Sequence, residues 1–174
     1  MEIAVLLALS SGLFLGWSLG ANDAANVFGT AVGTRMVKFS TAAIVCSVFV
    51  ILGAVFSGAG TADTLGKLGA INALGGAFVA AFAAAITVYW MTKAGLPVST
   101  SQAIVGAIIG WNMFSGSPTD SQTLIKILTT WVACPILAAL IAAPLFKMTQ
   151  AYLRWAKFHI LRLDAYTRAA LIFA

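Results

Sequence analysis

The sequence predicts an all-α polytopic membrane protein, and three observations lead to that class. Of the 174 residues, 61% are hydrophobic and only 9% are charged, and the mean hydropathy is +0.99, well outside the range of soluble domains. The apolar residues form long runs, most of them near the ~20 residues that a helix needs to cross a bilayer core. The charged residues fall mainly between and after these runs.

Five apolar stretches are evident, and they cover residues 3–19, 39–60, 70–92, 96–113 and 127–146. We therefore expect about five membrane segments, some of them broken or re-entrant. A sixth apolar run begins at Ala169, but the sequence ends at Ala174. That run is too short to cross a layer of about 30 Å at about 1.5 Å per residue. We expect the chain to be truncated, split, or completed by a partner.

Three regions follow from this division. Residues 1–146 form the predicted membrane domain, and residues 169–174 form the start of a further membrane segment. Between them, residues 147–168 alternate basic residues with aromatic and aliphatic ones. This pattern favours a basic amphipathic linker helix that lies in the headgroup region. Its histidine, His159, is interpreted as an interfacial side chain.

The positions of the basic residues predict topology. The net charge of +5 does not indicate nucleic-acid binding, because the charges form no patch on a soluble domain. If each stretch crosses once, most basic residues share one side, which the positive-inside rule makes cytoplasmic. They are Arg35, Lys38, Lys93, Lys147, Arg154, Lys157, Arg162 and Arg168, with Lys67 and Lys126 opposite. We expect an integral protein of the cell (inner) membrane, with the N-terminus outside and 147–168 cytoplasmic.

An odd number of crossings has a consequence for assembly. A second copy of the unit that continued from the cytoplasm would be inserted upside down, as in inverted-repeat transporters. The fold class is therefore predicted to be one half of such a transporter.

The first stretch runs into a polar motif, GANDAANVFGTAVGT, at residues 20–34. A straight helix from Ile3 to Gly33 would span about 46 Å, well beyond the bilayer core. We therefore expect this helix to break, bend or double back. Gly20 and Gly29, which bracket the polar residues, are the candidate positions for a functional break.

Asp23 is the first candidate functional residue, because it is the carboxylate inside an apolar stretch, where an ionised group is costly without a cation, a proton or water. Asn22, Asn26 and Thr30 follow helical spacing next to it. Their oxygens suit a Na⁺ or H⁺ coupling site. The alternative is structural: Asp23 caps a broken helix and the asparagines satisfy freed backbone groups.

A second motif, GLPVSTSQ, occupies residues 95–102. Pro97 disfavours helix at the residue before it, and Ser99 followed by Gln102 has the pattern of a capping box, so a helix is predicted to start here. Such a start presents unpaired N–H groups and the hydroxyls of Ser99, Thr100 and Ser101. It is a candidate anion site without arginine. A capping box alone also occurs at many ordinary helix starts.

The two motifs, with the segments GANDAANVFGTAVGTR and GLPVSTSQAIVGAIIG, resemble the signatures of the PiT family of inorganic phosphate transporters. The resemblance implies two inversely related repeats and symport of phosphate with Na⁺ or H⁺. By position it implies a phosphate site and a coupling-ion site. The phosphate residues would be Ser99, Thr100, Ser101, Gln102 and Asn22, and the coupling-ion residues Asp23, Asn26 and, more speculatively, Thr30.

The sequence departs from the family pattern in two respects. Ser101 and Gln102 stand where family members often carry Thr and His, which argues against a proton role for that histidine and favours ion-coupled or metal-phosphate variants. The second repeat is absent from the 174 residues. It is expected on a partner chain, on the other copy of a homodimer, or in a truncated part of the same chain.

The expected function is secondary active transport of inorganic phosphate by Na⁺ or H⁺ symport. The alternatives are a sulfate or other oxyanion permease of the same family, or a channel-like or structural membrane subunit without transport. An enzyme is not expected, because no histidine or second base lies near Ser99 or Asp23 to activate a nucleophile. No cofactor beyond the coupling cation, no bound metal and no nucleic-acid partner are expected.

Overall fold

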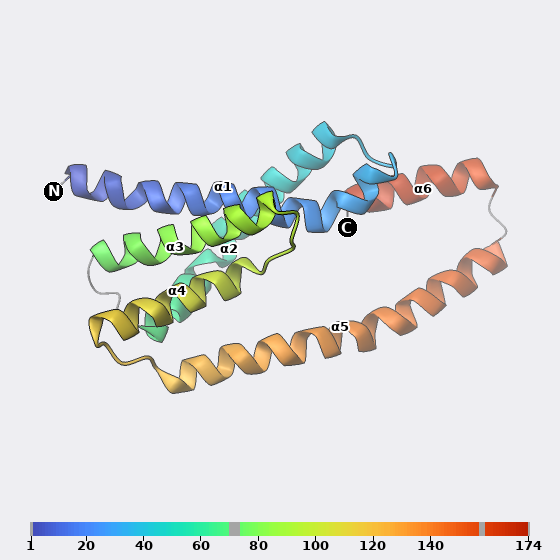
Figure 1. The fold of residues 1–174 in the computed structure, drawn as a ribbon. Coiled ribbons are helices and arrows are strands. Elements are labelled where there is room, and N and C mark those ends of the chain that lie inside the picture. The colour runs from blue at the N-terminus through green and yellow to red at the C-terminus, as the bar shows by residue number, and fades with distance from the viewer. Residues whose placement is uncertain (1, 70–73, 157–158, 174) are drawn as a thin grey trace. The chain divides into compact units, whose positions relative to one another are not determined.

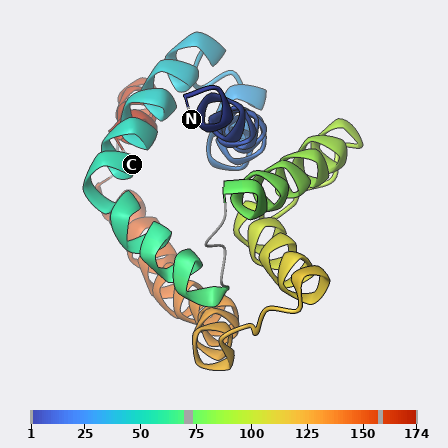
Figure 2. The same cartoon turned by 90° about the vertical axis from the view of Figure 1, so that its left-hand side faces the viewer.

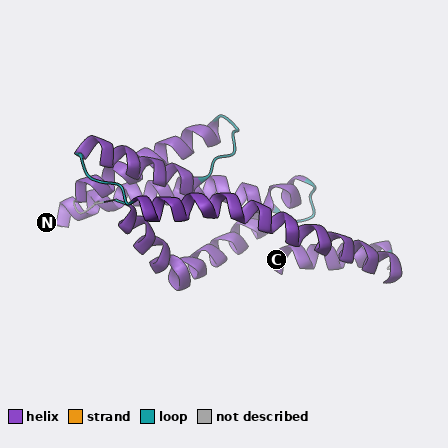
Figure 3. Cartoon of the chain, turned by 90° about the horizontal axis from the view of Figure 1, so that it is seen from below, coloured by secondary structure: helices purple, strands orange, loops and turns teal. Residues whose placement is uncertain are grey.

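The computed structural model describes residues 2–69, 74–156 and 159–173. These residues form six α-helices and, within the described ranges, no strand, apart from an isolated bridge between Gly69 and Thr119 (Figure 3). The helices are α1 (Glu2–Gly33), α2 (Phe39–Leu68), α3 (Leu74–Lys93), α4 (Thr100–Ser115), α5 (Ser121–Ala156) and α6 (Ile160–Phe173) (Figure 1). The all-α prediction is confirmed.

The chain divides into two compact units, Met1–Ser121 and Gln122–Ala174. The first unit holds α1 to α4, and the second holds nearly all of α5 together with α6. Each unit is described by itself below.

Among the described residues, three helices are long and apolar enough to cross a membrane, namely α2, α3 and α5. They correspond to the predicted stretches 39–60, 70–92 and 127–146. Most large apolar side chains of these helices are exposed, as expected of helices whose surroundings are lipid or other protein. This apolar, helical architecture is that of an integral membrane protein. The crossings expected of stretches 3–19 and 96–113 stay predictions.

The predicted break in the first helix is wrong. α1 is a continuous helix of 32 residues, about 48 Å long at the usual rise. It contains no proline, and glycine weakens a helix without ending it. The side chain of Asn26 bonds to that of Asn22, not to freed backbone groups. The capping interpretation of Asp23 falls with the break, because there is no helix end at this residue.

α3 lies between α1 and α4 (Figure 2) and is the centre of the first unit. Many of the buried residues of these two helices are small, among them Ser11 and Ser18 on α1 and Ala80, Ala84 and Ala85 on α3. Small side chains let helix backbones approach closely, which is the usual means of helix association in membranes. The small residues let α1 and α3 lie side by side, and beside them Phe14 and Trp17 of α1 contact the rings of Phe82 and Tyr89 of α3.

α3 and α4 form a helical hairpin whose tip lies alongside α1 (Figure 1). The side chain of Asn22 bonds to that of Thr92 near the end of α3, whereas α1 continues to Gly33, about 16 Å further. Lys93 is next to Thr92, so it lies beside the body of α1. The charge pattern predicts that Lys93 and Arg35 lie on the same side of the membrane, and Arg35 follows the end of α1. The hairpin tip thus brings the second motif to the level of the first.

α2 is attached to the rest of the first unit near its two ends. Within the described residues, Ala42 and Leu68 are its buried positions. At the second of these, the Leu68 carbonyl accepts from the Asp120 backbone N–H at 3.0 Å. Between its ends α2 follows a curved path (Figure 2), and the Ser57–Gly58 pair in its second half is of a kind that permits helix bending.

In the second unit, the range 147–168 is not a single linker helix. Residues 147–156 are the last turns of α5, and α6 begins at Ile160; residues 157–158 lie outside the described range. His159 precedes α6, and its carbonyl accepts from the N–H groups of Arg162 and Leu163. α6 continues to Phe173 without a boundary at residue 169. His159 is thus a helix-start residue.

The close approach of α3 and α4 at Gly76 predicts a sharp difference between neighbouring glycines. A Cβ on Gly76 would lie 2.7 Å from the indole Nε1 of Trp111, whereas a Cβ on Gly75 would meet nothing within 4 Å. We expect Gly76→Ala to destabilise the protein by about 1–3 kcal/mol, because the indole must shift. Gly75→Ala should be neutral or stabilising, because alanine favours helix. Thermal unfolding in detergent, followed by circular dichroism, measures both; equal midpoints would contradict this packing.

Candidate functional site

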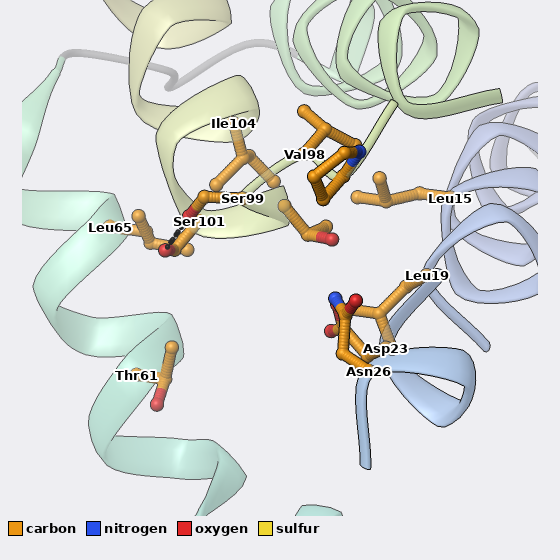
Figure 4. Close-up of a pocket in the computed structure, with 12 residues that line it drawn as sticks. Leu15, Leu19, Asp23, Asn26, Thr61, Leu65, Val98, Ser99, Ser101 and Ile104 are labelled. Atoms are coloured by element: carbon orange, nitrogen blue, oxygen red, sulfur yellow. Dashed lines mark hydrogen bonds between the residues drawn. The ribbon is translucent and has the colours of Figure 1, made fainter. Parts of the chain in front are cut away.

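The first unit contains a cavity of about 650 Å³ between α1, α2 and the start of α4 (Figure 4). Both sequence motifs contribute to its wall. The lining residues are Leu15, Leu19, Asp23, Asn26, Thr61, Leu65, Pro97, Val98, Ser99, Thr100, Ser101 and Ile104.

The α1 wall is a single helical face. Leu15, Leu19 and Asp23 recur every four residues, and Asn26 follows three residues later, so their side chains lie above one another. Asp23 is half-buried and Asn26 is exposed to the cavity. Leu15 and Leu19 make the first part of this wall apolar, and Asp23 and Asn26 supply its polar groups, a carboxylate and an amide.

Asn22 lies on a different face of α1 and does not line the cavity. It is only 5% exposed. Its amide Nδ2 donates to Thr92 Oγ1 on α3 at 3.0 Å, and its Oδ1 accepts from Asn26 Nδ2 at 3.3 Å. Asn22 is therefore connected to the cavity through Asn26. Its direct phosphate contact, expected from the sequence, stays a prediction.

The α4 wall is a helix N-terminus, as the capping box predicted. The helix begins at Thr100, and Ser99 Oγ accepts from the Gln102 N–H at 3.4 Å. Ser99 Oγ also lies 3.0 Å from Ser101 Oγ, the pair joined by a dashed line in Figure 4. The predicted helix start is confirmed.

Thr100 differs from its two neighbours. It is 8% exposed, and its buried Oγ1 has no hydrogen-bond partner among the described residues, although it lines the cavity. A buried hydroxyl without a partner is uncommon and calls for an explanation. A ligand in the cavity would supply one.

The cavity walls offer complementary chemistry. The side from α1 presents oxygen atoms and one carboxylate, which suit a cation. The side from α4 presents hydroxyl groups and a helix N-terminus, whose N–H groups and dipole favour an anion. The arrangement can therefore bind a cation and an oxyanion in one space.

Two expected residues lie elsewhere. Thr30 and Gln102 are both exposed, and neither lines the cavity. Gln102 takes part through its backbone N–H, which donates to Ser99 Oγ. Their roles in ion and phosphate binding stay predictions.

Sequence reasoning missed Thr61 and Leu65, which α2 contributes to the cavity, and Thr92, which bonds to Asn22. In Figure 4, Thr61 and Leu65 lie on the α2 ribbon across the cavity from Asp23. No local motif marks these residues, because only the packing of α2 and α3 brings them to the site. The one signal available in the sequence was that Thr92 is a polar residue at the end of the apolar stretch 70–92.

The chain is similar to known proteins over nearly its whole length. The phosphate transporter family matches residues 19–173, which include both motifs and the cavity walls. A protein of Pyrococcus furiosus named as a phosphate permease is 33% identical over 82% of this chain and 37% of its own length. A protein of Plasmodium falciparum named sodium-dependent phosphate transporter is 32% identical over 82% of this chain and 23% of its own length.

A solved structure titled "The sodium-dependent phosphate transporter" superposes with a TM-score of 0.76 at 24% identity, over 99% of this chain and 54% of that one. This likeness concerns the fold. The chain thus spans little more than a third of the Pyrococcus relative and about half of the solved structure. Because the family match covers nearly the whole sequence, the expected resemblance is confirmed, and this chain belongs to the phosphate transporter family.

Proposed function

We propose that the chain forms part of a secondary active transporter that moves inorganic phosphate across a membrane together with Na⁺ or H⁺. One observation carries the proposal: the cavity brings Asp23 and Asn26 of the first motif against Ser99, Thr100 and Ser101 of the second. The residues that the two motifs contribute to the cavity are more than 70 positions apart in the sequence. The names of the relatives support phosphate as the substrate.

Electrostatics gives the reason for coupling. A phosphate dianion is costly to transfer into a low-dielectric cavity unless an opposite charge accompanies it. No lysine or arginine is among the lining residues of this cavity. A cation held at Asp23 would offset the anion's charge and leave with it. The sodium-dependent names of the Plasmodium relative and of the solved structure favour Na⁺.

The proposal includes a second unit and an orientation. Inverted-repeat transporters bind substrate between two related units and expose it to each side in turn. Further polypeptide, a partner chain or a second copy in a homodimer would supply the other unit. By the positive-inside rule, the proposed orientation in the cell membrane has the N-terminus outside and residues 147–168 in the cytoplasm.

Replacing Asp23 tests the coupling role. We expect Asp23→Asn to abolish gradient-driven phosphate uptake, because a neutral amide cannot hold the cation that offsets the charge of the anion. The measurement is radiolabelled phosphate uptake into proteoliposomes under imposed Na⁺ and H⁺ gradients, with the chain alone and with a complementing half. The matched control is Asp63→Asn on α2, an exposed carboxylate paired with Lys67, which should leave uptake unchanged.

The outcomes of this experiment separate the alternatives. Competition by unlabelled sulfate that exceeds competition by phosphate would identify a sulfate permease. Absence of saturable anion uptake in every combination would favour a structural subunit. Uptake by Asp23→Asn equal to that of the unmodified protein would remove Asp23 from the coupling site.

Replacing Thr100 tests the anion wall, which is the side of the cavity formed by Ser99, Thr100 and Ser101 at the start of α4. We expect Thr100→Val to raise the KM for phosphate by roughly tenfold, because the variant removes a hydroxyl donor from the cavity. Its thermal stability should be unchanged or higher, because the variant also removes a buried hydroxyl without a protein partner. Uptake kinetics and thermal unfolding measure the two effects, with Thr130→Val on α5 as the control. A lower stability with an unchanged KM would assign Thr100 a purely structural role.

A further inference from the structure

A chain of hydrogen bonds connects Thr92 on α3 to the cavity. It begins at the Thr92 hydroxyl, whose hydrogen is already donated within α3. Thr92 Oγ1 donates to the Val88 carbonyl oxygen at 2.7 Å. A threonine hydroxyl has one hydrogen, so its oxygen is then available only as an acceptor. Thr92 therefore requires a donor from the helix that packs against it.

Asn22 on α1 supplies that donor. Its Nδ2 lies 3.0 Å from Thr92 Oγ1. Since Asn22 is only 5% exposed, water has little access to offer an alternative partner. The bond fixes which end of the amide faces α3. The carbonyl end, Oδ1, must face the other way, where it accepts from Asn26 Nδ2 at 3.3 Å.

The same logic orients Asn26. Its NH₂ group is directed to Asn22, so its Oδ1 is left on the opposite end of the amide, and Asn26 lines the cavity beside Asp23. Figure 4 shows the two side chains together on one face of α1. With the NH₂ group of Asn26 bonded to Asn22, Oδ1 is the Asn26 atom that remains to bind a cation in the cavity beside Asp23. The reverse orientation would place an NH₂ group beside the Asp23 carboxylate and compete with a cation for it.

We propose that Thr92 is a positioning residue for the coupling cation: by accepting from Asn22 it turns the Asn26 carbonyl oxygen into the cavity beside Asp23. The inference rests on the proposed function, because it concerns the cation side of that site. Thr92 itself does not line the cavity and acts through two asparagines. The ligand it prepares the site for is a monovalent cation bound by oxygen atoms.

The test compares three variants of α3 in the uptake assay. The cation concentration is varied at saturating phosphate, and the phosphate concentration is varied at saturating cation. We expect Thr92→Val to raise the apparent KM for the cation about fivefold to tenfold, the loss of one oriented hydrogen bond, with the KM for phosphate within about twofold. Thr92→Ser should restore the cation KM, because serine keeps the hydroxyl. The matched control is Thr87→Val, whose hydroxyl bonds only to Ala83 within α3.

A double-variant cycle keeps the inference testable if Thr92→Val is poorly folded. If Thr92 acts through Asn26, then adding Thr92→Ala to Asn26→Ala should raise the cation KM no further than Asn26→Ala alone. Additive effects would overturn the inference, as would an equal rise in both KM values or a failure of Thr92→Ser to restore the cation KM. Absence of uptake by the unmodified protein would instead overturn the proposed function, so the two failures are distinguishable.

Discussion

The parallel contact between α1 and α3 determines where the rest of the first unit lies. It depends on small side chains, including Ser11, Ser18 and three alanines, because close backbone approach replaces the hydrophobic effect as the source of helix association in an apolar solvent. The contact sets the depth of Thr92 against Asn22. Since α4 follows α3 after a short loop, the same contact also sets the depth of Ser99. A larger residue in this interface would therefore shift Ser99, Thr100 and Ser101 relative to Asp23 and Asn26 on the α1 side of the cavity.

The sequence predicted those features that depend on local chemistry. The start of α4 was predicted from Pro97, Ser99 and Gln102, because capping is decided within one turn of helix. The helical class and the second, third and fifth stretches followed from apolar length. The association of Asp23 with the serine-rich motif was predicted from chemistry and family resemblance, and the cavity brings those residues together. Their roles in binding stay predictions.

Features that depend on tertiary packing were not predicted. The first helix was expected to break, bend or double back, because its length exceeds the bilayer core, yet its backbone is helical from Glu2 to Gly33 and Asn22 finds its partner on α3. The contribution of Thr61 and Leu65 could not be foreseen, since neither belongs to a sequence motif and only the packing of α2 brings them to the cavity. The helix boundary at His159 was also missed. The alternation of basic and apolar residues is the same on either side of such a boundary and does not reveal it.

The attachment of α2 near its two ends has a consequence for the movement of solutes. A helix supported at its ends can bow between them with little loss of packing, because within the described residues its middle buries no side chain. Thr61 and Leu65 lie in the part of α2 that faces the cavity, whereas the charged and hydroxyl-bearing walls belong to helices joined by α3. Bowing of α2 would widen the passage into the cavity while the ligand-binding groups keep their mutual positions. For the proposed transporter, the rate of exchange with the surroundings and the strength of binding would then be set by different helices and could vary independently.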